Sequence, residues 1–207
     1  MTAIFKKEFK SYFNDLTGYL FIAAFSLSFS VLFLQNCIFA GRNVLPDVFS
    51  AMSSMLILFT PLLTVQHFTM ERRQNTWTLL ASSSVSAPAV VLGKFLAAAA
   101  LMAACVLSTW LYALVLSFYT AVYVGELICC QVGLLLLGCV YIAAGELISS
   151  LCRRRLTAAA ITLCALFLVN TAGSSASFTD GGFLGTLLEM LSPYTFFTRF
   201  CLGLFSF

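Results

Sequence analysis

Charged residues are scarce in this sequence. They make up 9% of its 207 residues, whereas 61% of the residues are hydrophobic. A soluble domain carries roughly 25% charged residues, so this chain could not cover a water-exposed surface with polar groups. A lipid bilayer is the solvent that tolerates such a composition, and helices satisfy their own backbone hydrogen bonds there. The composition therefore predicts an all-α, polytopic membrane protein.

Catalytic and nucleotide-binding motifs are also missing. No GxxxxGK[ST] sequence occurs, so the chain has no P-loop of its own and is not a transporter fused to its ATPase. His67 is the only histidine, and together with Glu71 it cannot complete a zinc site. We interpret His67 as a polar residue at the membrane boundary. No Ser/His/Asp or HExxH arrangement for a membrane protease is present. We expect no metal, no cofactor and no nucleic-acid partner.

The eight cysteines do not form a metal-binding or disulfide pattern. None belongs to a CxxC pair, and all of them lie in or beside apolar stretches. We therefore expect free thiols that pack as small apolar side chains. They are Cys37, Cys105, Cys129, Cys130, Cys139, Cys152, Cys164 and Cys201.

Five charge-free stretches can each supply the roughly 20 apolar residues that a membrane-crossing helix needs. The first has 26 residues, which is too long for the apolar core of a cleavable signal peptide. The third includes an outer loop near 119–126, and the fourth extends through Glu146 to Leu151. We expect one transmembrane domain over residues 1–207 with spans at 16–41, 48–70, 95–125, 127–145 and 156–179.

The basic residues predict the orientation of these spans. Nine lie before the first span, between the second and third, or between the fourth and fifth. Only Arg42 and Arg199 lie elsewhere. The positive-inside rule then places the N-terminus in the cytoplasm. We expect the protein in the inner membrane of the cell. The nine are Lys6, Lys7, Lys10, Arg72, Arg73, Lys94, Arg153, Arg154 and Arg155.

Two further segments have amphipathic character. In residues 2–16 the apolar side chains recur at helical spacing and lysines take the other face, which predicts a helix in the cytoplasmic headgroup region, near anionic lipid. Its role as an anchor or in gating stays open. Residues 181–199 carry a short apolar stripe interrupted by Glu189, Pro193 and Arg199, which we interpret as an outer re-entrant segment rather than a crossing.

The segment at 71–88 leaves the membrane after the second span and re-enters at the third. It offers one apolar and one charged face, and such a surface suits docking of a helix into a groove of another protein. Pro88 fits the first turn of the following helix. Its candidate contact residues are Glu71, Arg72, Arg73, Thr76, Trp77, Leu79 and Leu80.

These residues follow the pattern ERR-x-x-T-x-x-LL, then a polar link, then VLGKF opening a new span. The pattern resembles that of ABC-2 type transporter permeases. Within this family it is most similar to the gliding-motility and nitrous-oxide-maturation permeases. The SPYTFFTRFCLGLF tail is also similar to the segment before the last span of that family. Three departures stand out. Asn75 replaces a common Gly, Thr78 replaces a common acidic residue, and the family's sixth span is missing. The matching residues are Glu71, Arg72, Arg73, Thr76, Leu79, Leu80, Val85, Ser86, Leu92, Gly93, Lys94 and Phe95.

The resemblance implies that residues 71–86 form a coupling helix on a separate ATP-hydrolysing subunit. It also implies a pair of permeases, formed with a second copy or a related chain, and export as the direction of transport. The chain itself is then not an enzyme. Two other functions remain as alternatives, a membrane scaffold or assembly factor, and an intramembrane enzyme that would use His67, Glu71 and Glu146.

Glu146 is the best candidate for an intramembrane charge, and it lies near the cytoplasmic end of the fourth predicted span. Ionisable groups inside a membrane are costly and mark functional sites by default. The alternative is that Glu146 reaches towards the cytoplasm or pairs with an arginine of 153–155. Arg153, Arg154 and Arg155 serve most simply as a topology signal and lipid-phosphate contact, and a direct contact with the ATPase is the second interpretation.

Overall fold

The fold is a bundle of α-helices, shown in a computed structural model that describes residues 2–14, 16–39, 45–73, 87–118, 123–152, 154–176 and 192–201. Within these ranges no β-strand occurs, and the predicted all-α fold is confirmed there. The helices are α1 (Thr2–Asn14), α2 (Leu16–Phe33) with its π-helical extension η1 (Leu34–Ile38), α3 (Leu45–Arg73), α5 (Ala87–Ser108), α6 (Trp110–Ser117), α7 (Val124–Leu151), α8 (Arg155–Ala176) and α10 (Pro193–Cys201).

Four helical segments are long and apolar enough to cross a membrane. Large apolar side chains such as Leu27, Leu111 and Leu168 face outward from the bundle, as expected of a surface in contact with lipid. The predicted fifth span forms helix α8, whose apolar part, Arg155–Thr171, is shorter than the other four. The four segments are Leu16–Ile38, Leu45–Thr64, Pro88–Ser117 and Val124–Leu151.

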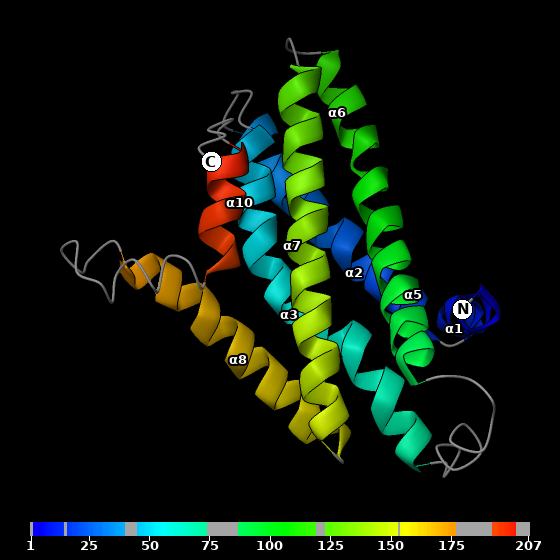
Figure 1. Cartoon of the computed structure of the whole chain (residues 1–207). Coiled ribbons are helices and arrows are strands. Elements are labelled where there is room, and N and C mark those ends of the chain that lie inside the picture. The colour runs from blue at the N-terminus through cyan, green and yellow to red at the C-terminus, as the bar shows by residue number, and fades with distance from the viewer. Residues whose placement is uncertain are drawn as a thin grey trace.

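The connections between helices fall into two groups. The end of α3, the start of α5 and the turn from α7 to α8 lie at one end of the bundle, whereas α6 and α7 meet at the opposite end (Figure 1). The ends of α3 and α8 that carry Arg72, Arg73, Arg154 and Arg155 are therefore at the same end of the bundle.

Helix α7 is the central element. It packs against α3, α5, α8 and α10, and it is buried along much of its length. It begins at Val124, earlier than predicted, so Glu126 lies in its first turn rather than in a loop. An acidic residue in the first turn is favoured by the helix dipole, which accounts for the earlier start.

Helix α2 packs through a stripe of phenylalanines. Phe21, Phe25, Phe29 and Phe33 recur every fourth residue and are all buried. The centroid of the Phe29 ring lies 5.5 Å from the ring centroid of Phe49 on α3 and 5.0 Å from that of Tyr112 on α6. Such edge and tilted contacts add to the packing of apolar area. These aromatic rings thus join three helices.

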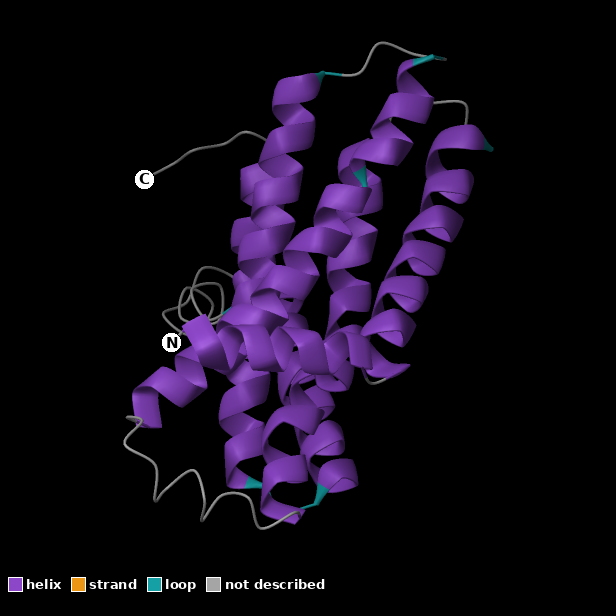
Figure 2. Cartoon of the chain, turned by 90° about the vertical axis from the view of Figure 1, so that its right-hand side faces the viewer, coloured by secondary structure: helices purple, strands orange, loops and turns teal. Residues whose placement is uncertain are grey.

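Helix α1 lies across the bundle. It is seen nearly end-on in Figure 1 and crosswise in Figure 2, so it runs roughly perpendicular to α7. Lys6, Lys7 and Lys10 are exposed, while Phe5 and Phe9 pack against the core. This arrangement suits the predicted interfacial helix, although α1 ends at Asn14 rather than residue 16, and α2 begins at Leu16.

Candidate functional site

A group of ionisable side chains from α1, α5 and α7 lies where α5 packs against α1 and α7, and most of them are buried. Glu146 of α7 is only 4% exposed, so the intramembrane acid singled out from the sequence is buried in the structure. It lies five residues before the end of α7 at Leu151. The bundle therefore contains a buried ionisable group near one end of α7.

Lys94 of α5 and Glu8 of α1 are the charged groups that act on Glu146. Lys94 attracts the carboxylate, and Glu8 repels it. Lys94 has no exposed surface at all. The alternative interpretation, a pairing of Glu146 with an arginine of 153–155, stays a prediction, since Arg153 lies outside the described residues. Lys94 was expected as a cytoplasmic charge, and its side chain lies in the core of the bundle.

The burial of Lys94 follows from the face of α5 on which it lies. Ala97, Ala98 and Leu101 follow it at three-, four- and seven-residue spacing, and all three are fully buried. Positions separated by three, four and seven residues share one face of a helix. This periodicity is the feature of the sequence from which the burial of Lys94 could have been predicted.

Tyr12 joins the amphipathic helix α1 to this site. Its side chain is 6% exposed, and its hydroxyl donates a long hydrogen bond of 3.4 Å to the Leu63 carbonyl oxygen on α3. Burial raises the pKa of Tyr12 well above its usual value, and the negative charges of Glu146 and Glu8 raise it further. The phenol is therefore neutral and remains a hydrogen-bond donor at physiological pH.

A close helix crossing lies beside Glu146. A Cβ atom at Gly145 would lie 2.6 Å from Oγ1 of Thr64 on α3. Thr64 donates a hydrogen bond to the Thr60 carbonyl oxygen (3.1 Å), and Thr60 donates one to that of Leu56 (2.6 Å). These side chains flank Pro61, which removes one backbone donor from α3. Small residues at such a crossing let helices approach closely in membranes.

Three buried polar atoms on this part of α7 make no hydrogen bond in the described structure. They are Oε1 of Glu146, Oγ of Ser149 and the hydroxyl of Tyr141. Ser149 is one turn beyond Glu146 on the same helix face. Most buried polar groups in proteins are hydrogen-bonded. Oε1 of Glu146 and Oγ of Ser149 are therefore candidates for a further polar contact on this face of α7.

A second polar contact ties α7 to the joint between α5 and α6. Nε2 of Gln131 donates a hydrogen bond of 2.9 Å to Oγ1 of Thr109, and both residues are buried. Thr109 is the residue at which α5 gives way to α6. Sequence analysis did not single out either residue, because the contact joins two different helices.

The predicted coupling residues are only partly covered by the structure. Glu71, Arg72 and Arg73 form the last turn of α3 rather than the start of a separate helix, and their side chains lie outside the described part. The other predicted coupling residues also lie outside it, namely Thr76, Trp77, Leu79 and Leu80.

The remaining candidates are distributed over the ends of the bundle. Arg154 is exposed, and Arg155 begins α8 with its Nε and Nη2 atoms buried and without a hydrogen bond. Pro193 begins α10, and Arg199 belongs to α10 with its side chain outside the described part. Arg153 and Glu189 lie outside the described residues.

Comparisons with protein-family models and with curated proteins found no significant match to this chain. Among the described residues, no group of three or more His, Cys, Asp or Glu side chains comes together as metal ligands would.

Proposed function

We propose that this chain is the membrane-spanning permease subunit of an ABC-type exporter in the inner membrane, and that a separate subunit hydrolyses ATP. The observation that carries the proposal is the match of residues 71–95 to the ABC-2 pattern, in a segment between two apolar spans. That segment connects the end of α3 to the start of α5, at the same end of the bundle as the turn from α7 to α8 (Figure 1). A partner at this end would reach both connections.

The proposed topology has five spans and a cytoplasmic N-terminus. Helix α8 would be the fifth span, tilted or completed by residues beyond its apolar part, and α1 would lie in the cytoplasmic headgroup region. Residues 181–199, which include the start of α10, would form the outer re-entrant segment. A second copy or a related permease would complete the transport path.

The continuity of α3 supports a mechanism of coupling. The helix runs without interruption from Leu45 to Arg73. A push on residues 71–73 by closing ATPase subunits would therefore be transmitted along α3 to Thr64, which contacts Gly145 of α7. The buried charges at Glu146 and Lys94 lie beside this contact. Movement of α3 against α7 would then change the spacing of the spans, which is what alternating access requires.

Copurification and ATPase stimulation test the proposal. An affinity-tagged full-length chain is purified from its native membranes, and the ATPase activity of the complex is measured with the wild type and with a Glu71→Ala/Arg72→Ala variant. We expect an ATP-binding subunit in the wild-type complex and a loss of about tenfold or more of its stimulation in the variant, since truncating buried interface charges costs 2–5 kcal/mol.

A matched control removes two charges from the opposite end of the bundle. Asp47 and Glu126 lie in the first turns of α3 and α7 and are exposed. The Asp47→Ala/Glu126→Ala variant should keep its ATPase stimulation. Absence of any ATPase from the wild-type complex would favour the scaffold alternative, and unchanged stimulation after Glu71→Ala/Arg72→Ala would refute the coupling role.

A further inference from the structure

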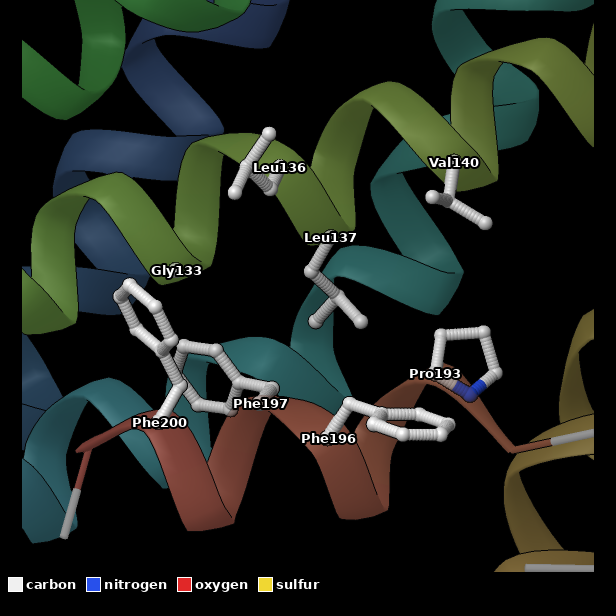
Figure 3. Close-up of a pocket in the computed structure, with 8 residues that line it drawn as sticks. All are labelled: Gly133, Leu136, Leu137, Val140, Pro193, Phe196, Phe197 and Phe200. Carbon is white, nitrogen blue, oxygen red and sulfur yellow. The ribbon is translucent and has the colours of Figure 1, made fainter. Parts of the chain in front are cut away.

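An apolar groove runs between α7 and α10. Its volume is about 230 Å³. Figure 3 shows the two helices side by side, with Phe200 near Gly133 at one end and Pro193 near Val140 at the other. The eight lining residues are Gly133, Leu136, Leu137, Val140, Pro193, Phe196, Phe197 and Phe200.

Gly133 makes the groove possible by letting α10 approach α7. A Cβ atom at Gly133 would lie 3.1 Å from Cδ2 of Phe197 and 3.2 Å from Cδ1 of Phe200. Phe197 is buried there, whereas Phe196, Leu136 and Val140 are about half exposed along the rim. The groove thus has a closed floor and an open side. Tyr194 holds α10 in place from the other side, through a 3.2 Å hydrogen bond with Ser50 of α3.

The position of the groove along α7 decides what surrounds it. Gly133 and Val140 are nine and sixteen residues after the start of α7 at Val124. At 1.5 Å per residue they lie about 13 and 24 Å along a helix that can span the membrane. The hydrocarbon core is about 30 Å thick. With α7 as a membrane-crossing helix, this part of it falls within the hydrocarbon core.

We propose that this groove binds one acyl chain of a bilayer phospholipid, in the leaflet next to the start of α7. An unfilled groove in hydrocarbon loses van der Waals contacts with its lining. Apolar cavities of 150 Å³ already bind small hydrocarbons. On each helix, the first and last lining residues are seven positions apart, which corresponds to about 10 Å. This length suits a linear chain that lies parallel to the helices.

A second copy of this chain is the weaker candidate for the occupant. Lipid tails are as apolar as leucine, so hydrophobicity alone does not bring two transmembrane helices together. A helix with its side chains is about 10–12 Å wide, too wide to enter a groove between two helices that already touch at Gly133 and Phe197. The proposal does not depend on the permease function, because the ligand is a lipid of the surrounding membrane.

Photocrosslinking tests this site in the full-length protein. The protein is reconstituted with phosphatidylethanolamine carrying a diazirine near the middle of one acyl chain, and crosslinked peptides are identified by mass spectrometry. We expect crosslinks at Leu136 and Phe196 in the wild type. Val140→Phe fills the groove, and its crosslink yield should fall about tenfold, as overfilling a packed site costs a factor of that order.

Two variants control for general lipid contact and for folding. Val115 on α6 is 45% exposed, close to the 49% of Val140, but lies away from the groove. Val115→Phe should leave the yield at Leu136 and Phe196 unchanged. Phe196→Ala widens the rim and should retain crosslinking at Leu136. Equal yields in wild type and Val140→Phe would overturn the proposal, and so would crosslinks that join α10 to a second copy of the chain.

Discussion

Gly145 of α7 and Thr64 of α3 are packed so closely that a Cβ atom on the glycine would come within 2.6 Å of the threonine Oγ1. Two other atoms of the same threonine would lie 2.9 and 3.1 Å away. Since Thr64 is a short, branched side chain, it cannot move aside as the end of a long side chain would. The separation of α3 and α7 is therefore set at this crossing.

Substitution of Gly145 by alanine should destabilise the protein. Overpacking of this kind costs about 1–3 kcal/mol, which thermal unfolding in detergent would detect. Gly125→Ala is the matched control, because nothing lies within 4 Å of a Cβ atom there. A Gly145→Ala/Thr64→Ala double variant should recover part of the loss. If Gly145→Ala were as stable as Gly125→Ala, the crossing would be looser than described.

Lys94 and Glu146 are both buried, and Lys94 attracts the Glu146 carboxylate, so the two residues should behave as a coupled unit. Lys94→Met leaves the carboxylate without its attracting cation, and removal of one partner of a buried pair costs about 3–5 kcal/mol. Glu146→Gln should also destabilise, and the Lys94→Met/Glu146→Gln protein should be more stable than the sum of the two losses predicts. Thermal stability of the four proteins, measured at one pH, gives the coupling.

The exposed Lys10 on α1 provides the control for loss of a positive charge. Lys10→Met should change stability by less than about 0.5 kcal/mol. Additive losses in the Lys94 and Glu146 variants would show that the two groups do not interact.

Tyr12 should make stability depend on pH in the alkaline range. The pKa of Tyr12 is raised in the folded protein, first by burial and then by Glu146 and Glu8. Its contribution is fully present below the unfolded pKa of about 10 and is lost as the pH rises through the folded value. The wild type should therefore lose thermal stability above about pH 10, and Tyr12→Phe should show a flatter profile.

Tyr19→Phe is the matched control for this profile, since Tyr19 is 56% exposed. It should follow the wild-type curve at every pH. At neutral pH, Tyr12→Phe should cost at most about 0.5–1.5 kcal/mol, the net contribution of an ordinary hydrogen bond, because the 3.4 Å bond to Leu63 is long. A Tyr12→Phe curve that overlaid the wild type throughout would contradict a buried phenol.

The helices themselves were largely predictable because apolar runs determine them. The first predicted span, 16–41, corresponds to Leu16–Ile38, and the fourth, extended to Leu151, corresponds to Val124–Leu151. Glu146 was also identified, because an acidic residue in an apolar run is conspicuous. In each case the signal lies within one stretch of sequence.

The partners of Glu146 were not predictable in the same way. Lys94 adjoins a polar segment and counted as a cytoplasmic charge, and its burial depends on how α1 and α7 pack against α5. The Tyr12 contact with Leu63 joins residues 51 positions apart. Such contacts depend on how helices are arranged in space, which hydropathy does not report.

The hydrogen bond from Tyr12 to Leu63 also bears on how the chain is assembled during synthesis. Helix α1 leaves the ribosome before α3, yet the carbonyl that accepts its phenol belongs to α3. This hydrogen bond of α1 therefore cannot form until α3 has been made. The order in which these helices reach their final positions therefore differs from their order along the chain.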